Sequence, residues 1–149
     1  MARQRDVGGK PKVARRAVVE GELAVAASTR RAIASRSVEK GDPLAAGELA
    51  GLLAMKRTPD LIPHCHSVPL TSSSVALRLG RRGVRVHAEA GTVDRTGVEM
   101  EALVGATVAL LTVWDMVKYL EKDARGLYPH TALGPVRVVV KRKGASPVP

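Results

Sequence analysis

An aspartate and a lysine three residues apart, Asp115 and Lys118, follow a long uncharged stretch over residues 102–114 and are the first candidates for chemistry. On a helix this spacing brings both side chains to one face, where they can form an ion pair. Most such pairs are ordinary surface salt bridges. The apolar turns before this one favour a buried pair, in which Lys118 would act as an acid or Asp115 as a base.

Two glutamates stand at the other end of the same stretch. Glu99 and Glu101 are two residues apart, so they diverge by about 200° on a helix and share a side only in an extended segment. Either one alone is explained by the favourable charge of an acid at a helix start. Acids at both ends of an apolar stretch are costly unless they are paired or used, which favours a catalytic site.

Two histidines flank the cysteine in His64-Cys65-His66. In an extended chain both imidazoles point the same way, which is a spacing suited to a metal ion. A metal needs a third protein ligand, and the sequence offers no second cysteine and no obvious pair of further histidines. The alternatives are surface histidines, a metal-dependent hydrolase built around His64 and His66, or a loop that binds substrate or transfers protons.

Composition limits the class of protein. The chain has 149 residues and a formal charge of +10, and it is long enough for one domain with its own core. No apolar run is long enough to cross a bilayer. The single cysteine excludes an internal disulfide and is compatible with a reducing compartment, so we expect a soluble, cytoplasmic protein.

The positive charge lies at the two ends of the sequence. Residues 1–16 carry +5 and residues 141–143 carry +3, which together make +8 of the total +10. Basic ends of this kind are typical of proteins that bind RNA or another polyanion, and an interaction protein of that kind is the alternative to an enzyme. Few aromatic residues are present for bases to stack on, which disfavours nucleic acid as a partner.

The hydrophobic pattern predicts one α+β domain over residues 1–149, in which helices cover one face of an antiparallel sheet. The predicted strands are 14–25, 74–79, 84–92 and 136–140, of which the second and third form a hairpin. The predicted helices are 29–35, 43–56 and 98–122, with Ser28 and Asp42 as caps of the first two. Residues 1–11 and 145–149 are expected to be flexible tails.

An apolar face is predicted for one of these segments and burial for two others. Helix 43–56 places Ala45, Leu49, Leu52 and Leu53 on one apolar face. Helix 98–122 should be buried almost all round, because residues 102–114 lack a polar face. Strand 136–140 is also expected to be buried, and the prolines between 58 and 70 should prevent a helix there.

Five motifs occur in order along the chain: Lys40-Gly41-Asp42, Ala54-Met55-Lys56-Arg57-Thr58, Leu61-Ile62-Pro63-His64-Cys65-His66, Thr96-Gly97-Val98-Glu99-Met100-Glu101-Ala102-Leu103 and Trp114-Asp115-Met116-Val117-Lys118. Together they resemble the cyclic pyranopterin monophosphate synthase family of molybdenum cofactor biosynthesis. The resemblance covers nearly the whole chain, and five ordered motifs are far more specific than any one of them.

The resemblance implies a ferredoxin-like α+β subunit in a hexamer, a trimer of dimers, with active sites at subunit interfaces. It implies a phosphorus–oxygen lyase that converts (8S)-3′,8-cyclo-7,8-dihydroguanosine 5′-triphosphate to cyclic pyranopterin monophosphate and pyrophosphate. A radical enzyme acting on GTP would supply this substrate and be the functional partner. No cofactor and no metal ligand is assigned, and whether a metal assists is left open.

Carried over by motif, the catalytic residues implied by the resemblance are Asp115, Lys118 and Lys40. The residues that match substrate-binding positions are His64, Cys65, His66, Met100, Glu101, Glu99, Arg15 and Lys56. The chain departs from the family pattern at His64, where leucine is usual, and at Trp114, where most members have tyrosine. Neither departure removes a proposed catalytic side chain. Contacts of Lys141 or Lys143 with phosphate are left open.

The implied reaction needs several proton transfers and the loss of pyrophosphate. A Lys–Asp pair with shifted pKa values suits proton transfer, because one partner can accept a proton while the other donates one. Arg15, Lys40 and His66 would neutralise charge on the leaving diphosphate. Glu99 and Glu101 would accept the N–H groups of the guanine-type edge.

The predicted site residues are far apart within one subunit. Glu101 and Asp115 are fourteen residues apart, which is about 21 Å along a continuous helix. One small substrate cannot easily touch both ends of such a helix. We therefore expect the two ends to meet across a subunit interface, between neighbouring helices that are antiparallel or offset.

Overall fold

The computed structural model describes residues 1–144, and the predicted tail at 145–149 lies outside the described residues. The strands are β1 (Val13–Ala24), β2 (Ser72–Leu79), β3 (Gly83–Asp94), β4 (Ala132–Leu133) and β5 (Arg137–Lys143). The helices are α1 (Ala27–Ala34), α2 (Pro43–Lys56), α3 (Thr58–Leu61) and α4 (Glu99–Glu121).

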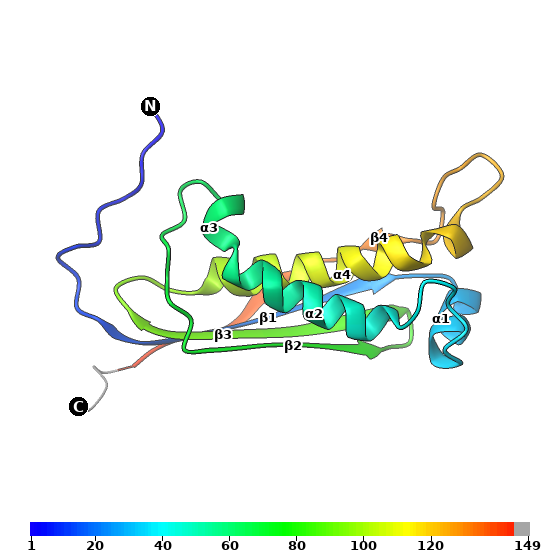
Figure 1. Ribbon diagram of the computed structural model, residues 1–149, viewed down its shortest axis with the longest axis horizontal. Helices are drawn as coiled ribbons and strands as arrows, with labels where there is room; N and C mark the ends of the chain where they lie inside the picture. Colours follow the sequence, from blue (N-terminus) through cyan, green and yellow to red (C-terminus); the bar gives the residue numbers. More distant parts are fainter. Residues whose placement is uncertain (145–149) are drawn as a thin grey trace.

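One antiparallel sheet carries the two long helices, α2 and α4, on the same face (Figure 1). The strand order is β2-β3-β1-β4, and β5 also pairs with β1. All pairings are antiparallel, and β1 pairs with β3 over its whole length, from Val13 opposite Asp94 to Ala24 opposite Gly83. The predicted α+β class is therefore confirmed.

The core lies between the sheet and the helices and consists mostly of Ala, Val and Leu. Residues of β1 alternate in direction, so Ala17, Val19 and Leu23 turn toward the helices and are fully buried. Ala102, Ala106 and Ala109 of α4 are fully buried, and Ala109 lies against Gly51 of α2, so short side chains allow close packing of this helix.

Helix α2 begins as predicted, and its apolar face is turned away from the sheet. The Asp42 carboxylate accepts hydrogen bonds from the Leu44 and Ala45 backbone N–H groups, at 2.9 and 3.2 Å. The leucine face, however, points away from the sheet: Leu49 is 60% exposed and Leu53 is 51% exposed. The predicted apolar face of this helix is therefore largely exposed in the single chain.

Glycines explain this orientation of α2. Gly47 and Gly51 are buried against α4, and a Cβ added at Gly51 would lie 2.7 Å from the carbonyl oxygen of Gly105. The backbones of α2 and α4 therefore approach closely only because these positions lack side chains. The small residues take the buried face, which leaves the leucines outside.

Helix α4 is one continuous helix, as predicted, but it is not buried all round. Val104 and Val108 are half-buried and Leu111 is exposed. Among the described helices it is also long and apolar enough to cross a membrane by length and composition, contrary to the sequence expectation. Half of its most apolar window is buried within the protein, where α4 packs on α2 and on strands β1 and β3, so it serves here as a core helix.

Three shorter segments differ from the predictions. Ser28 does not cap α1; the Ala26 backbone N–H at that helix start donates to the Glu121 carboxylate at 3.0 Å instead. Thr58–Leu61 is helical because Pro59 lies in the first turn, where its missing N–H costs no hydrogen bond. The last strand is mostly exposed rather than buried, and the two-residue β4 was not predicted.

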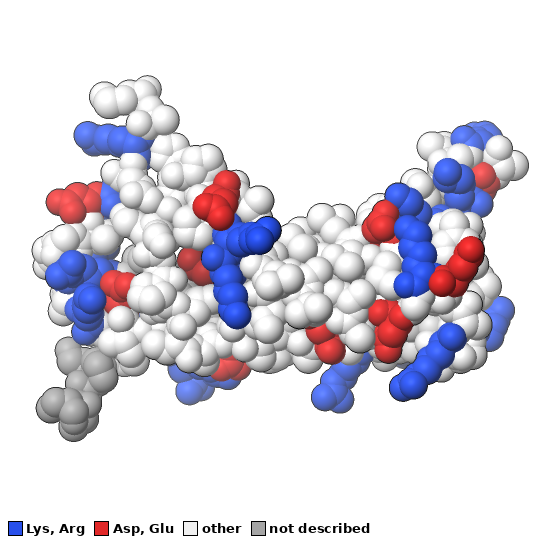
Figure 2. All heavy atoms as spheres, in the orientation of Figure 1, with Lys and Arg blue, Asp and Glu red and all other residues white. Residues whose placement is uncertain are grey.

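The face that carries α2 and α4 is uncharged in its middle. Figure 2 shows Lys, Arg, Asp and Glu gathered toward the two ends of this view, with a white stretch over the helices between them. The ends rise on one side, so the outline is hollowed between them. We call this surface the apolar saddle; its most exposed members are Leu49, Leu53 and Leu111.

Candidate functional site

A lysine–aspartate cluster, Lys40, Asp115 and Lys118, lies at the C-terminal end of α4. Lys118 Nζ is 2.6 Å from Asp115 Oδ1, and Lys40 Nζ is 3.1 Å from Asp115 Oδ2. Lys40 also donates to the Asp115 backbone carbonyl at 3.0 Å. The structure thus brings together the three residues predicted to be catalytic, each carboxylate oxygen facing one ammonium group.

Lys40 lies in the loop between α1 and α2, which positions it in this cluster. Val38 is buried in the core, and Gly41 has φ +100°, a conformation that favours glycine. The Glu39 backbone N–H donates to the Tyr119 hydroxyl at 2.8 Å. Sequence reasoning missed Tyr119; its spacing of four residues from Asp115 on one helix face was the available signal.

The cluster is exposed in the single subunit, so the predicted burial of the Asp115–Lys118 pair is wrong for this chain alone. The Asp115 side chain is 57% exposed and that of Lys118 is 48% exposed. Hydrogen bonds from Lys118 and Lys40 lower the pKa of Asp115, and the bond to Asp115 raises the pKa of Lys118. Both shifts favour the ionised pair, so proton transfer requires a change of surroundings, such as bound substrate or a covering subunit.

A cysteine–glutamate pair, Cys65 and Glu101, lies at the opposite end of α4. Glu101 is only 1% exposed, and its Oε1 accepts from Cys65 Sγ at 3.7 Å. Among the described residues its Oε2 is buried with no hydrogen-bond partner. Burial raises the pKa of Glu101, and burial together with the charge of Glu101 raises the pKa of Cys65 to about 11. Glu101 Oε2 is therefore a buried acceptor without a hydrogen-bond donor among the described residues.

The N-terminal segment runs along the histidines beside this pair. His64 Nδ1 donates to the Arg3 carbonyl at 2.8 Å, and His66 Nε2 donates to the Arg5 carbonyl at 2.7 Å. Gln4 Nε2 donates to the Cys65 carbonyl at 2.6 Å. Residues 1–11 contain no helix or strand, and their flexibility stays a prediction.

Glu99 and Arg15 lie at the same end, in separate contacts. Glu99 pairs with Lys141 of β5. Burial raises the pKa of Glu99, but the bond from Lys141 and nearby positive charge outweigh it, so the pKa is lowered overall. Arg15 Nε donates to the Asp94 carbonyl and its Nη2 to the Arg95 carbonyl, both at 2.9 Å.

Two further predicted residues lie toward this end of the molecule. Met100 is in the first turn of α4 and is exposed. Lys56 ends α2 and lines a hollow of about 460 Å³ with residues 68–73. Because Glu99 begins the helix, it diverges from Glu101: Glu99 reaches β5, whereas Glu101 is buried beside Cys65.

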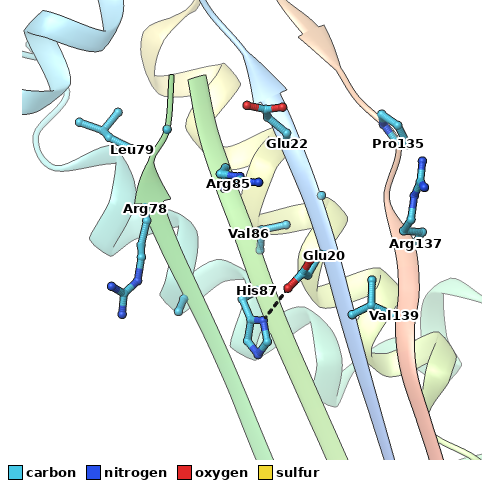
Figure 3. A pocket seen from close by; sticks show the side chains of 13 residues that line it. Glu20, Glu22, Arg78, Leu79, Arg85, Val86, His87, Pro135, Arg137 and Val139 are labelled. Atoms are coloured by element: carbon cyan, nitrogen blue, oxygen red, sulfur yellow. Dashed lines mark hydrogen bonds and ion pairs between the residues drawn. The ribbon is translucent and has the colours of Figure 1, made fainter. Parts of the chain in front are cut away.

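A larger hollow, of about 510 Å³, lies on the opposite face of the sheet and contains none of the predicted site residues. Figure 3 shows His87 and Glu20 facing each other in it, with Arg78, Arg85 and Arg137 around them. Among residues 1–144 no group of three His, Cys, Asp or Glu side chains could hold a metal ion.

The predicted residues therefore form two groups at opposite ends of one core helix. At one end a carboxylate is held between two ammonium groups; at the other a buried glutamate lies beside a thiol and two histidines. A small α+β protein that concentrates ionisable side chains in this way has the features of an acid–base enzyme.

Comparison with known proteins defines the family. The MoaC family model matches residues 4–144. A Methanosarcina acetivorans protein named probable cyclic pyranopterin monophosphate synthase is 48% identical over 96% of this chain and 90% of its own length. Proteins of the same name from Archaeoglobus fulgidus and Pyrococcus furiosus are 50% and 46% identical, each over 93% of this chain and 89% and 88% of their own lengths. The chain belongs to the MoaC family, as its motifs predicted.

Proposed function

We propose that this chain is an enzyme of molybdenum cofactor biosynthesis that converts the cyclised GTP intermediate, 3′,8-cyclo-7,8-dihydro-GTP, to cyclic pyranopterin monophosphate and pyrophosphate. Family membership and the names of the relatives support the reaction class. The observation that carries the proposal is Asp115 held between Lys118 and Lys40. The substrate would come from a radical cyclase acting on GTP, in the cytoplasm.

In this proposal the lysine–aspartate cluster transfers protons. Asp115 is ionised at neutral pH and can accept a proton, while Lys118 and Lys40 are donors at 2.6 and 3.1 Å from its two oxygens. Covering the cluster would lower the pKa of an ammonium group by removing water, which brings Lys118 closer to the range of a useful acid.

The group around Glu101, at the start of α4, would bind the guanine-type edge of the substrate and contribute to binding its phosphates. Glu101 Oε2 is buried without a donor, which suits an N–H group of the guanine-type edge. Arg15 and His66 would lie near the phosphates together with Lys40 of the other group. Met100, His64, Cys65, Glu99 and Lys56 complete the proposed substrate-binding set.

One subunit cannot bring both groups to one substrate. Helix α4 is continuous from Glu99 to Glu121, so Glu101 and Asp115 are about 21 Å apart along it. We therefore propose that copies of the chain pack through the apolar saddle. The lysine–aspartate cluster of one copy would then meet the group around Glu101 of another copy. The assembly would be a hexamer, a trimer of dimers of ferredoxin-like subunits, as the family resemblance implies.

The test is a mass-spectrometric assay in which purified protein is incubated with the cyclised GTP intermediate. We expect cyclic pyranopterin monophosphate and pyrophosphate to form with the unaltered chain. Asp115→Asn and Lys118→Ala should abolish product formation, because each removes one half of the ion pair, while the fold and assembly persist.

Asp60→Asn is the matched control for this assay. Asp60 is an exposed carboxylate in α3 and lies outside both groups, so this variant should retain full turnover. Near-normal turnover in Asp115→Asn or Lys118→Ala would contradict the assignment of the cluster. Loss of activity on chelation, restored by one metal, would favour the metal-dependent alternative at His64 and His66.

A further inference from the structure

The Tyr119 hydroxyl is the contact through which α4 holds the backbone of the loop next to Lys40. It accepts the Glu39 backbone N–H at 2.8 Å, directly before the lysine in sequence. Tyr119 is one turn of α4 beyond Asp115, so the same helix face carries both the reacting carboxylate and the group that fixes its neighbour.

Lys40 makes two contacts, and both are with residue Asp115. Its Nζ donates to Oδ2 at 3.1 Å and to the backbone carbonyl at 3.0 Å. A lysine side chain has many rotamers, so a fixed backbone at its base reduces the entropy lost when it is held in one geometry. The tyrosine bond supplies that fixed point one residue away.

We propose that Tyr119 is a positioning residue: by holding the Glu39 backbone, its hydroxyl keeps Lys40 on Asp115 for the proton transfers of the proposed reaction. The inference rests on the proposed function, and it assigns a role to a residue outside the five motifs. Tyr119 does not act on substrate itself in this account; it acts through Lys40.

The experiment is the Tyr119→Phe variant, which keeps the ring and removes only the hydroxyl oxygen. With the cyclised GTP intermediate we expect kcat to fall about fivefold, the effect of one net hydrogen bond, while KM stays within about twofold. Sedimentation and thermal unfolding should match the unaltered chain, because the freed Glu39 N–H is at an exposed loop and can bind water.

Ser37→Ala is the matched control. It removes a hydroxyl from the same loop, one that bonds to Ser35 and to the Ala32 carbonyl rather than to α4. We expect its kcat to be unchanged. An equal loss in Ser37→Ala, an unchanged kcat in Tyr119→Phe, or a rise in KM alone would overturn the positioning role.

A second measurement does not depend on activity. Acetylation of Lys40 by a small acyl donor, followed by mass spectrometry with Lys56 as internal reference, reports how firmly Lys40 is held on Asp115. We expect faster acetylation of Lys40 in Tyr119→Phe, and an unchanged rate would overturn the inference. Absence of turnover in the unaltered chain would contradict the proposed function, whereas the acetylation rate would still decide the role of Tyr119.

Discussion

Each carboxylate oxygen of Asp115 contacts one lysine, so the pKa of Asp115 depends on both Lys118 and Lys40. The bonds from Lys118 and Lys40 hold its pKa below the ordinary value. If ionised Asp115 is required, activity is present above that lowered pKa and is lost as pH falls through it.

Removal of Lys40 should therefore shift the acid limb of the activity profile. In Lys40→Met, Asp115 loses one of its two stabilising cations, so its pKa rises and residual activity should disappear at a higher pH than in the unaltered chain. The measurement is kcat/KM against pH. Lys122→Met, at a lysine that follows α4 outside the cluster, should leave the acid limb in place; an unmoved limb in Lys40→Met would argue that Asp115 does not set it.

The contributions of Glu99 and Glu101 to the stability of the fold should change with pH in opposite directions. The folded-state pKa of Glu101 is raised above 4.5 by burial, so the stability tied to its neutral form is lost as pH rises through that value. We expect Glu101→Gln to unfold at about the same temperature as the unaltered chain near pH 4 and at a higher temperature near pH 7.

Glu99→Gln is the counterpart to this experiment. The pKa of Glu99 is lowered overall, so its charged form contributes stability above its ordinary pKa, and that stability is lost as pH falls. Replacement by Gln should therefore lower the unfolding temperature near pH 7 and have little effect at low pH. Parallel pH responses of the two variants would contradict the assigned burial of Glu101.

At the scale of elements, the close packing of α2 on α4 depends on glycine. A Cβ at Gly51 would lie 2.7 Å from the Gly105 carbonyl oxygen and 3.0 Å from the Ala109 Cβ. Gly51→Ala should lower the free energy of unfolding by about 1–3 kcal/mol, since overpacking outweighs the gain in helix propensity. Chemical denaturation measures this, with Gly9→Ala, where nothing lies within 4 Å, as control; a stabilised Gly51→Ala would contradict it.

Local signals in the sequence were sufficient for some elements and not for others. Asp42-Pro43 fixed the start of α2, and the turn around Gly80 located the hairpin, because both depend on neighbouring residues alone. The orientation of α2 could not be predicted in the same way, because it depends on how closely another helix approaches. Hydrophobicity alone favours Leu49 as a buried residue of α2. The close approach of α4 instead requires Gly51 on the buried face, which leaves Leu49 exposed.

The candidate site follows the same division. The motifs identified Asp115, Lys118 and Lys40 by residue type and order, and the structure brings them together. The contact of Tyr119 with the Glu39 backbone joins positions 80 residues apart. No pattern within either segment predicts that contact, since it arises only when the loop folds back on α4.

At the scale of the whole molecule, the apolar saddle should hold the assembly together. Leu49 and Leu53 are more than half exposed in the single chain, a costly arrangement unless another surface covers them. Leu49→Asp combined with Leu53→Asp should shift the protein toward smaller species in sedimentation velocity. Leu127→Asp, at an equally exposed leucine in the loop after α4, should not; an unchanged assembly in the double variant would contradict the proposed interface.

Mixing inactive variants tests whether sites form between subunits. Asp115→Asn and Glu101→Gln each disable a different end of α4, so a mixed dimer would hold one site with both residues intact. After joint refolding in equal amounts, we expect about a quarter of full activity, because half of the dimers are mixed and each has one intact site. Asp115→Asn mixed with Lys118→Ala should stay inactive, and equal results from the two mixtures would contradict shared sites.

The contacts of residues 3–5 with His64–His66 have a practical consequence for anyone who prepares this protein. The amino terminus and the last residues of β5 lie toward the same end of the molecule (Figure 1). A purification tag joined before Met1 would be separated by only two residues from Arg3, whose carbonyl accepts the hydrogen bond from His64. Kinetic constants from tagged and tag-free preparations should therefore be compared first, since vector design alone can alter the histidine loop while leaving Asp115 and its lysines unchanged.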